Sequence, residues 1–301
     1  MSLLVTGSIG IDTVETPHGR APNVLGGSAV YFSLAASLFG PVRLVGVVGD
    51  DFDHAMFDPL RSRNIDLRGL EIRKGSRTFR WHGRYEGAMN EAHTVDVELN
   101  VLAERNAPIP AEFHDSRYVF LANTHPTLQR ECAEKMRGAK LIVSDTMNLW
   151  IENELDELKK TLKIVDGLVL NEGEARMLSG SAHLVKAGRA ILDLGPKFVV
   201  IKKGENGSIL VSRDDLCMMP AFPTTNVVDP TGCGDCFAGA FMGHIASLDR
   251  VDRESLRAAM GRGSIVASFV LESFSIQALH RVGIADVNAR LAELRAMMQF
   301  A

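Results

Sequence analysis

The sequence predicts a layered α/β protein with helices on both faces of a mainly parallel sheet. Short apolar segments rich in β-branched residues recur along the chain and lack polar alternation, as expected of parallel strands covered on both faces. Helical patterns separate these segments, and this alternation requires crossover connections. The expected strands are Leu3–Thr6, Leu44–Val48, Tyr118–Leu121, Leu141–Val143, Gly167–Leu170 and Phe198–Ile201.

The helices between these strands are expected at Gly27–Phe39, Glu172–Leu178 and His183–Leu192. Gly40 follows the first of them, and glycine is the preferred residue just past a helix C-terminus. We therefore expect that helix to end at Phe39.

Length and composition are those of an ordinary soluble globular protein. The 301 residues are 46% hydrophobic and 23% charged, which suits a single domain spanning 1–301. The net charge of −4 gives no electrostatic reason to expect nucleic-acid or membrane partners. The apolar N-terminus lacks a basic segment, and no apolar run approaches the ~20 residues that span a bilayer. Four cysteines do not suggest a disulfide framework, so we expect a cytoplasmic protein.

Residues 78–99 depart from this pattern and predict a β-hairpin. Phe79, Trp81 and Tyr85 share one face of the first strand, and Val95, Val97 and Leu99 share one face of the second, with the turn GAMNEA between them. The hairpin could be an antiparallel edge of the main sheet. We expect instead a small β lid, inserted in the single domain and formed by about 12–20 and 78–99, that could also provide a homodimer contact.

The most informative segment is Val227–Gly243. Gly232 and Gly234 flank Cys233, and a helix of small apolar residues is expected to begin at about Asp235. Such glycines let successive N–H groups converge, and a helix N-terminus adds partial positive charge, so this turn suits a phosphate. A carboxylate there would repel phosphate unless it contacts the attacking hydroxyl, which indicates that Asp235 is a weak general base. A first-turn Asp after a glycine turn is also common for purely structural reasons.

This segment resembles the C-terminal signature D-P-T-G-A-G-D-x-F of the ribokinase-like (PfkB) carbohydrate and nucleoside kinase family. Here it reads Asp229-Pro-Thr-Gly-Cys-Gly-Asp-Cys-Phe237. The resemblance implies a ribokinase-like α/β/α core, with Asp235 as catalytic base and the amides of Gly232, Cys233 and Gly234 as an anion hole. The C-x-x-C formed by Cys233 and Cys236 has no second cysteine pair to support a zinc or redox site.

The resemblance also implies an acceptor site near the N-terminus. Asp12 matches the aspartate that binds substrate hydroxyls in relatives, and Gly26 and Gly27 match the glycine pair that lets the backbone approach a sugar. Tyr31 lies near the place where many sugar kinases have Asn, and its ring could stack on a base or sugar. Asn148 follows an expected strand, where open α/β sheets bind ligands.

On the nucleotide side, Asn171 and Glu174 match the family's N-x-x-E motif, which implies indirect Mg²⁺ binding through water. A helix-capping role explains the same pair. In relatives the turn after Phe198–Ile201 borders the nucleotide, so the resemblance makes Lys203, Gly204 and Gly207 candidate ATP contacts. It also implies that residues from Ser264 to His280 help to form the adenine pocket, with Ser264 as an ATP contact. The segment Val270–Ser275 departs from relatives, which leaves monovalent-cation dependence open.

The predicted function is that of an ATP-dependent kinase that transfers the γ-phosphate to a hydroxymethyl group of a sugar. A nucleoside is the alternative acceptor. A non-catalytic ligand-binding protein on the same fold is an alternative of another class, although it would need no base. A nicotinamide-dependent oxidoreductase is disfavoured because no G-x-G-x-x-G follows the first strand.

Overall fold

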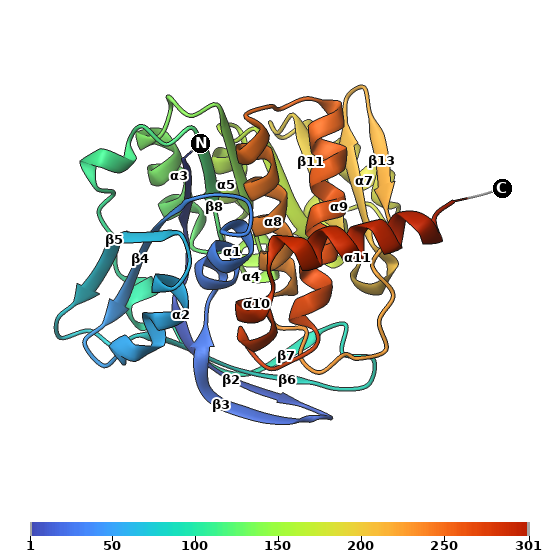
Figure 1. Cartoon of the computed structure of the whole chain (residues 1–301). Helices are drawn as coiled ribbons and strands as arrows, with labels where there is room; N and C mark the ends of the chain where they lie inside the picture. The colour runs from blue at the N-terminus through green and yellow to red at the C-terminus, as the bar shows by residue number, and fades with distance from the viewer. Residues whose placement is uncertain (1, 300–301) are drawn as a thin grey trace.

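The computed structural model describes residues 2–299 and contains one large sheet of nine strands (Figure 1). The strand order is β13-β12-β11-β10-β9-β8-β1-β4-β5, and all neighbouring pairs from β11 to β5 are parallel. β12 and β13 extend the sheet antiparallel. The strands are β1 (Leu3–Thr6), β4 (Val42–Gly49), β5 (Ile65–Arg73), β8 (Tyr118–Leu121), β9 (Leu141–Asp145), β10 (Gly167–Asn171), β11 (Phe198–Lys202), β12 (Ser208–Ser212) and β13 (Leu216–Met219).

Helices cover both faces of this sheet, so the predicted α/β/α layering is confirmed. One core lies under α1 (Ser28–Ala36), α8 (Cys233–Leu248), α9 (Arg253–Val270), α10 (Gln277–Arg281) and α11 (Ile284–Met297). The other lies under α3 (Pro126–Lys135), α4 (Asn148–Asn153), α5 (Leu155–Leu162), α6 (Glu172–Ser179) and α7 (Leu184–Leu192), while the short α2 (Asp58–Arg61) packs near β5. Within residues 2–299, no helix has the length and apolar character needed to cross a bilayer.

The predicted elements agree with these bounds to within three residues, with one error of interpretation. α1 ends at Ala36, its C-cap Ser37 has helical dihedrals, and Gly40 is not in the left-handed region. The prediction that Gly40 ends this helix is therefore wrong, because the turn after α1 closes without a residue in the left-handed conformation. At the end of α6, Gly180 does adopt φ 68° and fills that role.

The hairpin predicted at 78–99 belongs to a separate sheet, which we call the small sheet. Its order is β3-β2-β6-β7, formed by β2 (Gly10–Thr16), β3 (Gly19–Gly26), β6 (Phe79–Tyr85) and β7 (Ala92–Glu98). It is therefore not an edge of the main sheet, and Figure 1 shows it crossing below the main-sheet strands. Asp12 pairs with Trp81, and Trp81 pairs with Val97, so these three residues share one face.

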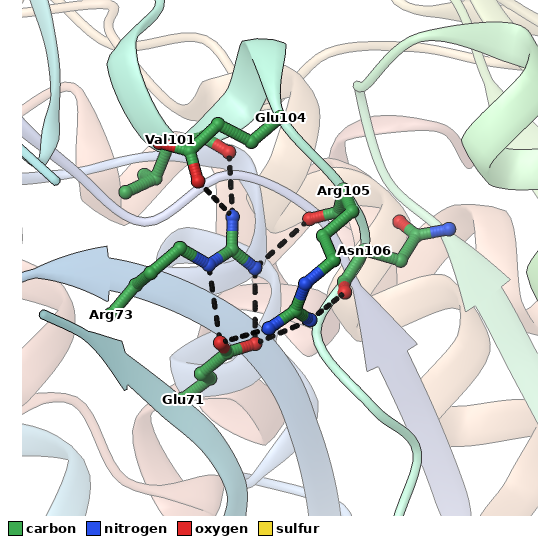
Figure 2. Close-up of polar contacts among 6 residues, drawn as sticks. All are labelled: Glu71, Arg73, Val101, Glu104, Arg105 and Asn106. Carbon is green, nitrogen blue, oxygen red and sulfur yellow. Dashed lines mark hydrogen bonds and ion pairs between the residues drawn. The ribbon is translucent and has the colours of Figure 1, made fainter.

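A buried ion-pair network anchors the chain where it returns from the small sheet (Figure 2). Arg73, at the end of β5 and 9% exposed, forms two hydrogen bonds to Glu71 and one to Glu104, and also donates to the carbonyls of Val101 and Arg105. Arg105 binds Glu71 from the other side. Because every donor of the guanidinium fork meets an oxygen, the buried charge is compensated.

Candidate active site

The site begins at the N-terminus of α8, where the backbone turn requires glycine. Gly232 is the N-cap with φ 77°, a conformation that side chains disfavour. A Cβ on Gly232 would also lie 2.4 Å from the Tyr31 ring. Tyr31 is only 1% exposed and supports this turn from beneath, so the prediction that its ring could stack on a ligand is wrong. The packing of α1 against α8 buries the ring in the core.

Backbone N–H groups at this turn are available to an anion. The Cys233 amide donates to the Pro230 carbonyl at 3.2 Å, and the Cys236 amide donates to the Gly232 carbonyl at 2.8 Å. The hydrogen bonds formed within residues 2–299 leave the amides of Gly234 and Asp235 without an acceptor. The free donors and the dipole of the 16-residue helix point to the same place. Of the three amides predicted to form the anion hole, only that of Cys233 therefore already donates a hydrogen bond within the described part of the chain.

Asp235 lies in the first turn of α8 and is partly buried. Burial raises the pKa of its carboxyl from 3.8 to about 6, and the ammonium of Lys202 opposes this rise. At pH 7 most of the population is therefore ionised, yet the group is a stronger base than an ordinary aspartate. The expectation of a weak base is corrected by this burial.

A pH dependence follows from this value. If Asp235 accepts a proton during turnover, kcat should fall about tenfold per pH unit below about 6, because only the carboxylate can act as the base. Initial rates at saturating ATP and saturating acceptor between pH 4.5 and 8 would measure this limb without the effect of Asp12 on acceptor binding. A profile that stays flat down to pH 4.5 would contradict either the raised pKa of Asp235 or its role as the general base.

Asp12 is a second buried carboxyl that faces the site from β2. It is 4% exposed, and its Oδ1 atom has no hydrogen-bond partner in the described structure. Burial, together with the charges of Asp229 and Asp235, raises its pKa to about 7. A Cβ on Gly26 would lie 1.8 Å from Asp12 Oδ2, so only glycine leaves room for the carboxylate. Gly27 has φ 100° and caps α1.

The loop before α8 is fixed by Asp229, which is 1% exposed. Its two carboxylate oxygens accept the amides of Thr231 and Ser275 at 2.9 and 3.0 Å. The Thr231 hydroxyl donates to the Tyr85 hydroxyl at 3.2 Å, which joins the loop to the small sheet. The loop is therefore held from both the α9–α10 connection and β6.

Two more buried carboxyls lie at the end of β9 and in the first turn of α6, which directly follows the neighbouring β10. Asp145 ends β9, is 6% exposed and has no partner for Oδ1, and Glu174 is 7% exposed. Burial raises the pKa of each, while Lys202 lowers it. Asn171 and Glu174 form the capping box of α6, with bonds of 2.7 and 2.8 Å, as the structural interpretation of the motif predicts.

This donor set suits a hydrated Mg²⁺. Carboxylate oxygens are its preferred protein ligands, and a nearby cation would offset the burial of Asp145 and Glu174. Residues 2–299 contain no cluster of three or more potential ligands.

The predicted nucleotide-side turn, which contains Lys203, Gly204 and Gly207, joins β11 to β12. The Lys203 amide donates to the Gly207 carbonyl within this turn. A Cβ on Gly204 would lie 3.4 Å from Asn90 of the β6–β7 turn. The Ser264 hydroxyl donates to the Pro220 carbonyl at 2.7 Å, so it is already engaged. Asn148 is exposed at the start of α4. The ligand roles of all these residues stay predictions.

Sequence reasoning chose Lys203 and missed its neighbour Lys202. The Lys202 ammonium influences the pKa of Asp145, Glu174 and Asp235 together. The available signal was the position of Lys202 as the last residue of a strand, because residues at the carboxyl ends of parallel strands meet at one edge.

Comparison with known proteins identifies the family. The model of the pfkB family carbohydrate kinases matches residues 23–280. The chain belongs to this family. It is therefore an ATP-dependent phosphotransferase that acts on sugars or nucleosides, as this fold and family imply.

Individual pfkB kinases resemble the chain over most of its length. Cytidine kinase of Thermococcus kodakarensis is 32% identical over 250 residues, which cover 80% of this chain and 87% of that protein. Fructokinase-2 of Solanum lycopersicum is 26% identical over 278 residues, covering 83% and 84%. The structure of aminoimidazole riboside kinase from Salmonella enterica has a TM-score of 0.78 at 17% identity and covers 97% of this chain and 100% of that one, which supports the fold.

Proposed function

We propose that this kinase transfers the γ-phosphate of ATP to the hydroxymethyl group of a nucleoside. The observation that carries the reaction is a pair of carboxyls, the partly buried Asp235 and the buried Asp12, beside the free amides of Gly234 and Asp235; the charge of Asp235 raises the pKa of Asp12. A site that only binds ligand has no need of two such costly groups.

The reaction follows from these groups. The acceptor hydroxyl passes its proton to the Asp235 carboxylate as its oxygen forms a bond to the γ-phosphorus, and the bond to the ADP oxygen breaks with its electron pair leaving on ADP. The α8 amides stabilise the charge on the transferred group. Asp12 accepts hydrogen bonds from the acceptor's hydroxyls and fixes its orientation. Glu174, Asn171 and Asp145 would hold Mg²⁺ through water, and the bound ion would neutralise phosphate charge.

The small sheet would act as the lid of this site. Its Tyr85 hydroxyl accepts from Thr231, and its β6–β7 turn approaches Gly204, so it reaches both the loop before α8 and the nucleotide-side turn. A lid of this kind excludes water and limits hydrolysis of ATP.

The choice of a nucleoside rests on the apolar face of this sheet. Trp81 and Val97 lie on the same face as Asp12, and Val95 and Val97 are about half exposed, at 49% and 48%. An aromatic ring and apolar side chains beside the hydroxyl-binding carboxylate suit a base attached to the sugar. A homodimer contact through the same sheet stays a prediction. A free sugar is the second candidate, which the match to fructokinase-2 favours.

An acceptor screen with ATP and Mg²⁺ tests the proposal. Cytidine, uridine, adenosine and inosine are compared with ribose and fructose by ADP release and by detection of the phosphorylated product. We expect kcat/KM for the best nucleoside to exceed that for either sugar by roughly 100-fold, because base stacking contributes about 1–3 kcal/mol. Trp81→Ala should then lower nucleoside kcat/KM roughly tenfold or more and leave sugar turnover unchanged.

Other results would redirect the assignment. Phosphorylation of a sugar but of no nucleoside would favour the second candidate. Product formation from none of these acceptors would contradict the proposed acceptor class.

A further inference from the structure

The Lys202 side chain extends across the first turn of α8. Lys202 is the last residue of β11 and pairs with Asn171 of β10 and Ser208 of β12. A Cβ placed on Gly234 would lie 2.6 Å from the Lys202 Nζ atom and 3.6 Å from its Cε atom. The ammonium group is therefore next to the backbone that carries the free amides of Gly234 and Asp235.

This contact explains why residue 234 is glycine. Gly234 lies inside α8 and does not have a positive φ, so its backbone conformation does not require glycine. Glycine is also less favourable than alanine inside a helix. The space that the missing side chain leaves is the space occupied by the Lys202 ammonium.

The ammonium is surrounded by acids that it does not contact. Asp145, Glu174 and Asp235, from β9, α6 and α8, are all affected by its charge. Within residues 2–299, however, no carboxylate oxygen lies within 4.0 Å of Nζ, and no hydrogen bond from Nζ is formed. A lysine that only balanced these acids would pair directly with one of them, since a paired buried charge costs less.

We infer that Lys202 is a further catalytic residue whose ammonium binds a non-bridging oxygen of the phosphoryl group during transfer. The ammonium offers three donors, and the Gly234 and Asp235 amides offer two more on the same side. In a loose transition state the charge lies on the equatorial oxygens of the transferred group, so donors fixed here act when that charge develops. The inference rests on the proposed position of that group at the N-terminus of α8.

Steady-state kinetics of Lys202→Met test this role. Methionine keeps an apolar stem that ends where the Cε atom lies, so it removes the ammonium group with its charge and its donors. We expect kcat to fall roughly 100- to 1,000-fold, as for loss of one oxyanion donor, while the KM values for ATP and acceptor stay within about threefold. Lys202→Arg should recover part of the loss. Lys197→Met is the matched control, because Lys197 precedes β11 and binds Asp166 in solvent, and it should keep wild-type kinetics.

A double-mutant cycle with Gly234→Ala adds an independent measurement. The new methyl group would displace the Lys202 ammonium but keep its charge and the residue 234 amide. Gly234→Ala should lower kcat roughly tenfold in the wild type and less than about twofold in Lys202→Met, because contacting residues are not additive. The acid limb of the pH–rate profile should also move to higher pH in Lys202→Met, since the ammonium holds the Asp235 pKa down.

The outcomes separate this inference from the proposed function. A wild-type enzyme that phosphorylates its acceptor, with Lys202→Met within threefold in kcat, would overturn the inference and leave the function intact. A raised KM for ATP alone would also overturn it, because the contact would then belong to the ground state. If Lys202→Met does not fold, Gly234→Ala decides: wild-type kcat at an unchanged melting temperature overturns the inference, and a loss supports it.

Discussion

Replacing Asp235 by asparagine is expected to lower kcat about 1,000-fold, within the range of about 10²–10⁴ that a positioned general base contributes. Asparagine has the same shape but cannot accept the hydroxyl proton. ATP binding should be nearly unchanged, because the α8 amides are backbone groups and remain in place. Turnover with the acceptor found in the screen and calorimetric titration with ATP measure the two effects.

The control for Asp235→Asn is the pH profile. The wild-type limb near pH 6 should be absent from the residual kcat of the variant at saturating acceptor, since that limb belongs to this carboxyl. A variant that keeps turnover within about fivefold of wild type would exclude Asp235 as the base. A normal melting temperature shows that any loss of rate is chemical.

Asp12→Asn is expected to stabilise the fold and weaken acceptor binding. The pKa of Asp12 rises from 3.8 to about 7 on folding, so the ionised carboxyl opposes folding by up to about 4 kcal/mol. This penalty is absent below about pH 4, grows between pH 4 and 7, and is fully present above pH 7. Asparagine carries no charge and removes it. The melting temperature of the variant should therefore exceed that of wild type at pH 8, and the difference should shrink toward pH 4.5.

Acceptor binding should change in the opposite direction. Hydrogen bonds to a charged group contribute about 1.5–3 kcal/mol, so KM for the acceptor should rise roughly 10- to 100-fold. Glu15→Gln provides a matched control, because Glu15 lies on the same strand but binds Arg84 and His82 on the outer face. It should leave the acceptor KM unchanged. An Asp12→Asn variant with no gain in stability at pH 8 would show that the carboxyl is not strained by burial.

The sequence was sufficient to predict most of the fold, because its signals were local. Parallel strands that are continuous apolar segments, such as Tyr118–Leu121, can be located from composition, whereas the parallel β5 carries several charged residues and is absent from the predicted strands. Gly40 was misinterpreted because a glycine after a helix does not reveal its dihedral angles. The alternation in 78–99 predicted strands, but only the pairing of β2 with β6 shows that they form a separate sheet.

The candidate site could be predicted from the sequence only where its residues are contiguous in one segment. The turn around Gly232 and Asp235 is contiguous, so the motif was visible. Tyr31 and Lys202 approach that turn from α1 and β11, which are distant in sequence, and their contacts depend on packing. Tyr31 could therefore be taken for a ligand contact when it is a core residue. The burial that raises the pKa of Asp235 and Asp12 is likewise a property of the assembled site.

The Arg73 network gives the small sheet a fixed pivot. Arg73 clamps the segment after β7, and the Asp51 carboxylate binds the amide and hydroxyl of Thr78 at 2.7 Å each, just before β6. With its base held at both points, the sheet is a lever whose free ends are its two turns. One of those ends packs against the loop before α8, where Met89 is buried beside Val227 and the Tyr85 hydroxyl accepts from Thr231. A small rotation at the pivot would thus have to break this contact before the sheet could move away from the main sheet.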